Sequence, residues 1–302
     1  MTETARQAQE WLQQGLRALA DLHPAAREPL GRALEAFRTL GDLRGEAVCR
    51  MRLGQAAFQG GDPRSALDDY QAALDGFRTL ADPAGEAACL RRLGEVELRA
   101  GRLPQAEDCL QAALTRFREL AERSGEADCL LGLGSLALAR GDAAGGFQLF
   151  RSALGLQREV ANQAGEQAAL GLMARILAAR GHWIPATVLA GRALEIGRAL
   201  EDALGQSLLL KLLLEILTAQ NRREPALATL VVLRDLARER EGAAALRRAD
   251  PLLDQVRAAL PPDQWATIET LAPTLLDDVL RAAEAALAGS DPELWPEGGM
   301  GV

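Results

Sequence analysis

Few residues in this sequence have the type and spacing that catalysis requires. The chain has two histidines, His23 and His182, and neither has a cysteine or serine at a familiar spacing. Nucleophilic and general-base chemistry needs such partners within hydrogen-bond reach. We therefore predict no catalytic residues and a protein that is not an enzyme. No cofactor is expected either.

The four cysteines are equally poor candidates for chemistry. Cys49, Cys89 and Cys129 fall at one repeat position, and none of the four, Cys109 included, belongs to a Cys-x-x-Cys pair. Packed helices lie about 10 Å apart, too far for these thiolates to share a metal ion. We predict buried apolar thiols, no metal site, and a reducing cytoplasm as the location.

One stretch matches the glycine pattern of a dinucleotide-binding loop. Residues 132–137 read Gly-Leu-Gly-Ser-Leu-Ala. A true loop of this kind follows a strand and opens a helix. Here the glycines lie inside an expected helix, so we interpret the match as accidental.

The amino-acid composition favours a helical protein and argues against several functions. Hydrophobic residues make up 48% of the 302 residues, aromatic residues only 4%, and the abundant residue types are helix formers. The net charge of −8 argues against nucleic-acid binding. We expect no signal peptide and no membrane insertion, because the N-terminus is polar and Lys211 and Glu215 interrupt the most apolar run. A single lysine among 34 basic residues suggests a bacterial, GC-rich genome.

A repeat with a period of 40 residues dominates the sequence. A Gly-Glu-Ala tripeptide begins at Gly45, Gly85 and Gly125 and degrades at Gly165 and Gly205. A Leu-Gly pair follows each of the first three tripeptides, at 53–54, 93–94 and 133–134. Units of this length cannot bury an apolar face alone, so we expect the copies to stack on one another.

Each unit is predicted to form a helical hairpin. In the first full copy a helix covers residues 43–59 and ends at Gly60-Gly61. Asp62 then caps a second helix, with Pro63 in its first turn, that reaches about Leu80. Asp82-Pro83 begins the next unit in the same way.

The spacing of small and large residues resembles the tetratricopeptide repeat. That family expects a small residue, an alanine twelve positions on, a large residue four further and an alanine three after that. The matching sets are Gly54, Ala66, Tyr70 and Ala73; Gly94, Ala106, Leu110 and Ala113; and Gly134, Gly146, Phe150 and Ala153. The 40-residue form is similar to Leu-Gly-Asn repeat adaptors and related bacterial proteins, although Gln55, Glu95 and Ser135 stand where those adaptors carry asparagine.

The resemblance implies an all-α fold, a right-handed α-solenoid of about six hairpins with a C-terminal helical cap. We expect a repeat array over residues 1–240, with a partial unit at 1–40, full units at 41–80, 81–120, 121–160 and 161–200, and a degraded unit at 201–240. An acidic cap follows at 241–288 and a flexible tail at 289–302. Within this C-terminal part we predict helices at about 243–260, 263–271 and 273–287.

The resemblance also places the first helix of each hairpin along a concave groove. The positions that would line it carry mixed side chains, and the candidates for partner binding are Met51, Gln55, Phe58, Arg91, Glu95, Arg99, Asp128, Leu131, Ser135, Leu138, Arg175 and Lys211. Such a groove suits a peptide or helix with acidic groups and apolar anchors. Reversal of Arg91 and Arg99 to glutamate is predicted to weaken binding without unfolding the array.

The leading interpretation is a scaffold or adaptor that binds another protein or peptide. One alternative is a self-assembling structural protein, a homo-oligomer whose interface is the acidic C-terminal part or a terminal hairpin. The tail segment 291–295, Asp-Pro-Glu-Leu-Trp, would then dock on a neighbouring copy. A third interpretation is a peptide-sensing regulator, although no helix-turn-helix with a basic face is present.

Overall fold

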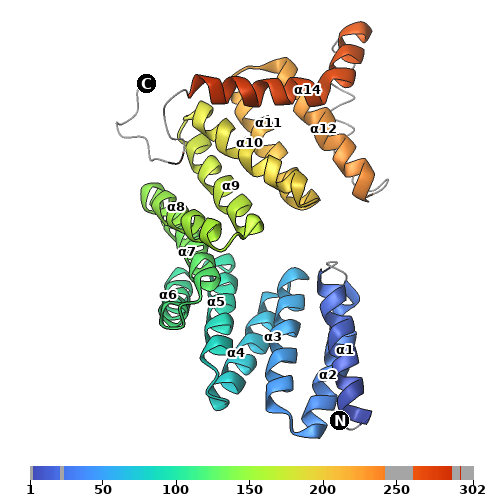
Figure 1. Ribbon diagram of the computed structural model, residues 1–302, viewed down its shortest axis with the longest axis vertical. Coiled ribbons are helices and arrows are strands. Elements are labelled where there is room, and N and C mark those ends of the chain that lie inside the picture. The colour runs from blue at the N-terminus through green and yellow to red at the C-terminus, as the bar shows by residue number, and fades with distance from the viewer. Residues whose placement is uncertain (1–2, 21–23, 242–260, 288–292, 294–302) are drawn as a thin grey trace. The chain divides into compact units, whose positions relative to one another are not determined.

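The computed structural model describes residues 3–20, 24–241, 261–287 and 293. These residues form helices and short links, with no strand among them, so the all-α prediction is confirmed (Figure 1). The chain divides into two compact units, Met1–Asp142 and Ala143–Val302.

Nearly all helices of the repeat region have the same length and follow one another through short links. The first unit contains α1 (Glu3–Ala20), the 3₁₀ turn η1 (Pro24–Ala26), α2 (Arg27–Leu40), α3 (Leu43–Gln59), α4 (Pro63–Thr79), α5 (Pro83–Arg99), α6 (Leu103–Glu119) and α7 (Arg123–Ala139). The second contains α8 (Ala143–Glu159), α9 (Gln163–Ala179), α10 (Trp183–Ala199), α11 (Ala203–Ala219), α12 (Arg223–Glu241) and α14 (Pro262–Ala286). Within each unit consecutive helices pack together, and α5 also touches α7 as α9 touches α11.

Several helices, among them the first helix of each hairpin from α3 to α11, begin at a residue whose side chain caps the first turn. Asp62 accepts a hydrogen bond from the backbone N–H of Ser65 at 3.1 Å, and Asp82 accepts one from Gly85 at 3.1 Å. The same contact recurs at Asp42, Glu122, Asn162 and Asp202. Each cap satisfies one of the unpaired N–H groups of the first turn, which is why these positions start helices.

The helices end at residues in the left-handed conformation. A residue with φ between 50° and 84° recurs every twenty positions, namely Gly41, Gly61, Ala81, Gly101, Ala121, Gly141, Ala161, Gly181, Glu201 and Asn221. Glycine adopts this conformation without penalty, whereas a residue with a Cβ atom is strained there. Half of the links therefore carry strain that the other half avoid.

Glycines of the Gly-Glu-Ala tripeptide allow one hairpin to approach the next. A Cβ atom on Gly85 would lie 2.3 Å from the ring of Phe77, and one on Gly45 would lie 2.4 Å from the ring of Phe37. Within a hairpin, Gly54 is covered in the same way by Tyr70, at 2.9 Å. The small residues thus permit the close helix packing that the sequence pattern predicted.

The C-terminal part differs from its prediction. The helices expected at 263–271 and 273–287 are a single helix, α14, which contains Pro273 and bends along its length (Figure 1). Proline removes only one hydrogen bond of the helix, and an apolar stripe that includes Ile268, Ala272 and Leu276 is buried without interruption across it. The helix predicted at 243–260 lies outside the described residues.

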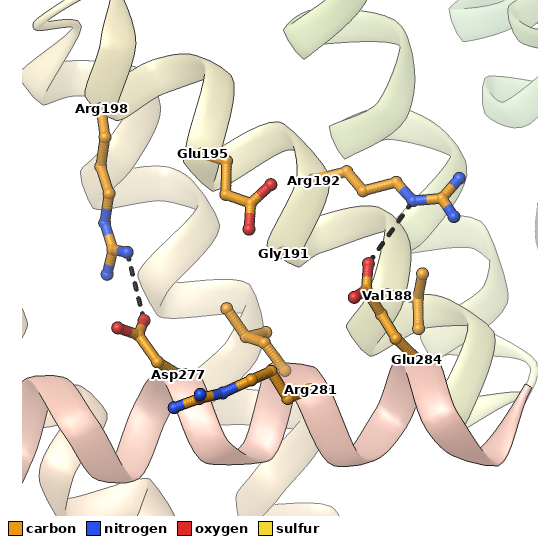
Figure 2. A pocket seen from close by; sticks show the side chains of 9 residues that line it. Val188, Gly191, Arg192, Glu195, Arg198, Asp277, Arg281 and Glu284 are labelled. Atoms are coloured by element: carbon orange, nitrogen blue, oxygen red, sulfur yellow. Dashed lines mark hydrogen bonds and ion pairs between the residues drawn. The ribbon is translucent and has the colours of Figure 1, made fainter.

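The helix α14 packs against α12 and α10. Its Leu280 covers Gly191 of α10, where an added Cβ atom would lie 2.9 Å away. Figure 2 shows two ion pairs beside this contact: Arg198 of α10 lies 3.2 Å from Asp277, and Arg192 lies 3.8 Å from Glu284. The acidic C-terminal helix is therefore held by arginines of the repeat.

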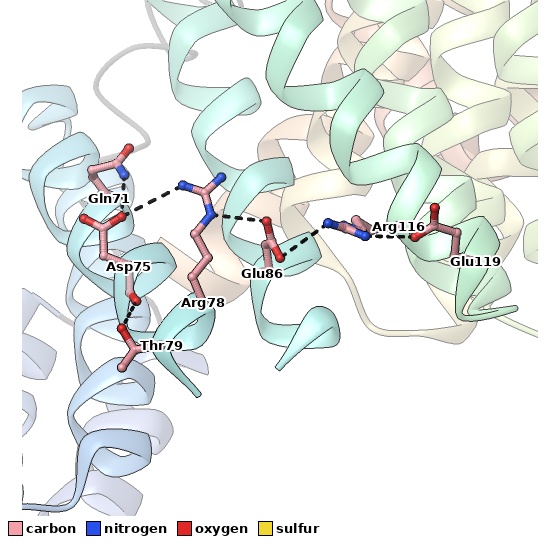
Figure 3. A network of polar contacts seen from close by, with 7 residues as sticks. All are labelled: Gln71, Asp75, Arg78, Thr79, Glu86, Arg116 and Glu119. Atoms are coloured by element: carbon pink, nitrogen blue, oxygen red, sulfur yellow. Dashed lines mark hydrogen bonds and ion pairs between the residues drawn. The ribbon is translucent and has the colours of Figure 1, made fainter. Parts of the chain in front are cut away.

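A ladder of ion pairs joins the end of each hairpin to the start of the next. Arg38, Arg78, Arg118 and Arg158 each bind the glutamate eight residues later, at 2.9, 3.2, 2.8 and 2.7 Å. In Figure 3 the second of these pairs, Arg78–Glu86, extends through Arg116 to Glu119. In the fifth copy Gln206 replaces the glutamate, and the equivalent arginine, Arg198, pairs with Asp277 instead.

The strained links predict a simple gain in stability. Replacing Ala81, Ala121 or Ala161 by glycine removes a left-handed conformation that disfavours a Cβ atom, and each change should raise the free energy of unfolding by about 0.5–1 kcal/mol. Denaturant unfolding of the three single variants and of the triple variant measures this. The control is Ala72→Gly in the exposed middle of α4, which should lower stability by about 1 kcal/mol. A triple variant no more stable than the parent would contradict the strain argument.

The caps predict a specific pH dependence. The backbone N–H of Gly85 and the guanidinium of Arg44 lower the pKa of Asp82. A carboxylate with a lowered pKa stabilises the fold above its unfolded pKa of about 4, and this contribution is lost as the pH falls through the folded pKa. Asp82→Ala should cost about 1 kcal/mol at pH 7.

Asparagine provides the matched control, because Asn162 already caps α9 without titrating in this range. The stability difference between the parent and Asp82→Asn should therefore shrink between pH 6 and pH 3 in thermal unfolding scans. A difference that stays constant with pH would show that the charge of Asp82 does not contribute.

Candidate functional site

The first unit contains a hollow of about 470 Å³ lined by three successive first helices of the hairpins. It lies between α3, α5 and α7, and its walls are formed by Phe58, Arg91, Arg92, Glu95, Leu98, Arg99, Asp128, Leu131, Gly132 and Ser135. The helix α5 contributes half of these residues, α3 contributes only Phe58 from its last turn, and α7 contributes residues of its middle turns.

Seven of the twelve predicted groove residues meet in this hollow. They are Phe58, Arg91, Glu95, Arg99, Asp128, Leu131 and Ser135. Met51, Gln55 and Leu138 are half-buried on α3 and α7 but do not line it. Arg175 and Lys211 lie exposed on α9 and α11, in the second compact unit. Whether any of these residues binds a partner stays a prediction.

The floor of the hollow is a small network of charged side chains. Arg91 pairs with Glu95 on the same helix and lies 3.6 Å from Asp128 of α7, and only 13% of its side chain is exposed. Arg92 approaches Glu95 at 2.9 Å. Burial alone would lower the pKa of Arg92, but the charge and hydrogen bond of Glu95 outweigh burial and raise it.

This network changes the role predicted for Arg91. Its guanidinium balances two carboxylates inside the fold, so Arg91→Glu would place three acidic groups together and destabilise the array. Arg91 is therefore unsuitable as a probe of binding alone, and the predicted tolerance of the double reversal does not follow for this position.

Arg92 was missed by the sequence analysis although a signal for it existed. The predicted inward positions on α5 included Arg91 and Glu95, and residues three or four apart on a helix share a face. Arg92 stands three positions before Glu95, a predicted groove residue, and so belongs to the same stripe.

The rim of the hollow combines a cation with an aromatic ring. The guanidinium of Arg99 lies 4.5 Å from the centre of the Phe58 ring, which is the geometry of a cation–π contact. Arg99 is exposed, and in the described part of the chain it makes no ion pair. With the half-buried Leu98 and Leu131 beside it, the rim offers one accessible positive charge among apolar surfaces.

The positive charge continues behind the hollow. Arg52 of α3 contacts Gln55 at 3.1 Å, and burial together with the nearby charge of Arg92 lowers its pKa. Tyr70 is almost fully buried behind α3, and burial raises its pKa to about 12. This side of the hollow therefore adds positive charge without adding a residue that titrates near neutral pH.

The residues considered for other chemistry do not form such a site. Cys49, Cys89 and Cys129 are buried, and burial is the main cause that raises the pKa of each thiol to about 12. Such thiols are unreactive. Among the described residues, no group of three potential metal ligands occurs. The stretch 132–137 lies inside α7, as predicted, and follows no strand.

The hairpins agree with the comparisons with known proteins. Models of the tetratricopeptide repeat match residues 51–118 and 86–159. A search of curated proteins by sequence gave no match. In the described ranges, no helix is long and apolar enough to span a membrane.

Several solved structures have a similar fold. A Rap protein complexed with Competence and Sporulation Factor is 15% identical with a TM-score of 0.62, over 83% of this chain and 74% of that one. The Rap conjugation gene regulator of plasmid pLS20, in complex with the Phr* peptide, is 14% identical with a TM-score of 0.61, over 91% and 72%. PilF of Pseudomonas aeruginosa is 19% identical with a TM-score of 0.53, over 83% and 99%.

The fold and these matches define an α-solenoid protein built from stacked helical hairpins. The two family models identify tetratricopeptide repeats between residues 51 and 159 of this chain.

The charged floor of the hollow predicts that Glu95→Gln lowers stability more than the same substitution at an exposed glutamate. Glu95→Gln leaves Arg91 and Arg92 without their shared carboxylate, in a site where only 26% of the Glu95 side chain is exposed. We expect it to lower the free energy of unfolding by about 1–3 kcal/mol.

The control for this measurement is Glu119→Gln, which removes an exposed carboxylate that pairs with Arg116 on the same helix. Surface pairs of this kind contribute little, and we expect a change below about 0.5 kcal/mol. Equal losses for the two variants in urea unfolding would show that the network around Glu95 is not needed for stability.

Proposed function

We propose that this protein is a non-enzymatic, cytoplasmic scaffold that binds a peptide or helix of another protein in the hollow of its first unit. The observation that carries the proposal is the meeting of Phe58, Arg99 and Leu131, from three successive hairpins, at one concave site. Binding sites for peptides commonly combine apolar pockets with a few placed charges.

The rim defines the chemistry of the partner segment. Leu98 and Leu131 suit an apolar side chain, and Arg99 suits a carboxylate next to it. The ring of Phe58 orients the guanidinium of Arg99, so less side-chain entropy is lost when a carboxylate binds. A short segment with an acidic residue beside a leucine or aromatic residue fits these features.

A peptide-sensing role is the second candidate. Two solved proteins with this fold were each determined in a complex, one with Competence and Sporulation Factor and one with the Phr* peptide. The second of these complexes supports a peptide as the occupant of a protein with this fold. The self-assembling alternative predicts a mass that rises with concentration in light scattering.

The test uses peptides selected from a display library on the full-length protein. Selected peptides should carry Asp or Glu next to an apolar residue. Arg99→Glu should weaken the tightest peptide at least ~10-fold, a loss of about 1.4 kcal/mol, because attraction becomes repulsion at the rim. Fluorescence anisotropy with the labelled peptide measures the Kd.

Arg64→Glu is the matched control, because it makes the same charge change at an exposed position in the first turn of α4. It should alter the Kd less than about twofold. Because both variants change the net charge equally, this control separates the effect of net charge from a contact at the rim. Basic peptides from the selection, or equal Kd values for Arg99→Glu and the parent, would refute binding at this rim.

A further inference from the structure

Two arginines of the second unit hold a carboxylate from far along the chain. Arg158, at the end of α8, donates two hydrogen bonds to Glu293, at 2.8 and 2.9 Å. Arg192 of α10 lies 3.4 Å from the same carboxylate, and only 16% of the Glu293 side chain is exposed. A guanidinium that donates two parallel hydrogen bonds is the strongest side-chain arrangement for binding a carboxylate.

A comparison of the repeat copies shows that this pair of arginines occurs in one copy only. The ladder position is arginine in five copies, at Arg38, Arg78, Arg118, Arg158 and Arg198. The residue 34 positions further along is Ala72, Ala112, Ser152, Arg192 and Val232. A second arginine therefore faces the ladder at the α8–α10 step and at no other step of the sequence.

The charges around the pair allow the carboxylate to leave. Arg158 also binds Glu166 at 2.7 Å, and Arg192 also approaches Glu284 at 3.8 Å. Each arginine keeps an acidic partner when Glu293 departs, so departure leaves no unpaired buried charge. The hydrogen bond to Glu293 is the largest cause that raises the pKa of Arg158, ahead of the hydrogen bond to Glu166.

We propose that Arg158 and Arg192 form a carboxylate-binding site, separate from the hollow of the first unit, that the chain fills reversibly with its own Glu293. The occupant is the C-terminal segment that carries Glu293, in the same molecule. A free segment of the same sequence competes for the site when the chain's own carboxylate is removed.

The contact between Arg192 and Glu293 also stabilises the end of α14. Arg192 interacts with Glu284 near the end of that helix and with Glu293 beyond it, so one cation holds two points of the C-terminal part. Release of Glu293 removes one of them. The end of α14 should then exchange its amide hydrogens faster, because local opening depends on the contacts that hold an element.

The first experiment measures binding of a labelled peptide with the sequence of residues 288–297 to full-length proteins. The peptide should bind the Glu293→Gln protein at least ~10-fold more tightly than the parent, because the parent's own segment competes at an effective concentration in the millimolar range. Binding should be lost in Glu293→Gln/Arg192→Gln. A peptide with glutamine in place of Glu293 should not bind.

Hydrogen–deuterium exchange gives a second, independent readout on the same proteins. Exchange over 276–287 should rise in Glu293→Gln and stay unchanged in Glu159→Gln, which removes an equal charge from the exposed neighbour of Arg158. Equal exchange in the two variants, or equal peptide binding to Glu293→Gln and the parent, overturns the proposal. A parent protein whose mass doubles with concentration, and does not in Glu293→Gln, overturns the intramolecular occupant in favour of a second copy.

Discussion

The close approach of one large side chain to one glycine determines the step between consecutive hairpins. At the α4–α5 step the ring of Phe77 lies where a side chain of Gly85 would begin, 2.3 Å from an added Cβ atom. The segment 77–86 also contains the left-handed link at Ala81, the cap at Asp82 and the ion pair Arg78–Glu86. Because all four features share one short segment, the packing of the ring holds the cap and the ion pair in register.

The later copies show what happens when this packing changes. Gln157 takes the place of the phenylalanine at the α8–α9 step, and Gly197 takes it at the α10–α11 step. Polar contacts compensate there: Gln167 donates to Asp202 at 3.1 Å, and Gln206 donates to the carbonyl of Gly197 at 3.0 Å. Since Gln206 is uncharged, Arg198 is available to Asp277 of α14.

The loss of the ladder glutamate in the fifth copy leaves Arg198 to the C-terminal cap. A glutamate at position 206 would compete with Asp277 for Arg198, whereas Arg192 stands outside the ladder and pairs with Glu284. Most of the net negative charge of the chain lies in this C-terminal part. The charge asymmetry along the sequence therefore has a structural reason within the second unit.

The helices and their boundaries could be predicted because their signals are local. The glycine pair at 60–61 and the cap Asp62 act on their own turns, and α3 ends and α4 begins where these signals place them. The helix break predicted at Pro273 was wrong because its cause is not local. The buried stripe that keeps α14 continuous depends on tertiary contacts with α12. The ion pairs of Arg91 could not be predicted from the sequence either, because its long side chain can reach acidic groups on several helices.

The position of the hollow follows from one difference between the copies. Arg52, Arg92 and Gly132 share one repeat position, and a Cβ atom on Gly132 would already lie 2.8 Å from Leu110. Where α3 and α5 carry a guanidinium, α7 carries no side chain, and space remains in front of Arg92. The neighbouring Leu-Gly positions are the same in each of these copies, whereas the position just before them holds an arginine in α3 and α5 and a glycine packed against Leu110 in α7. The repeat therefore allows the lining of the hollow to differ while the stacking of the hairpins stays the same.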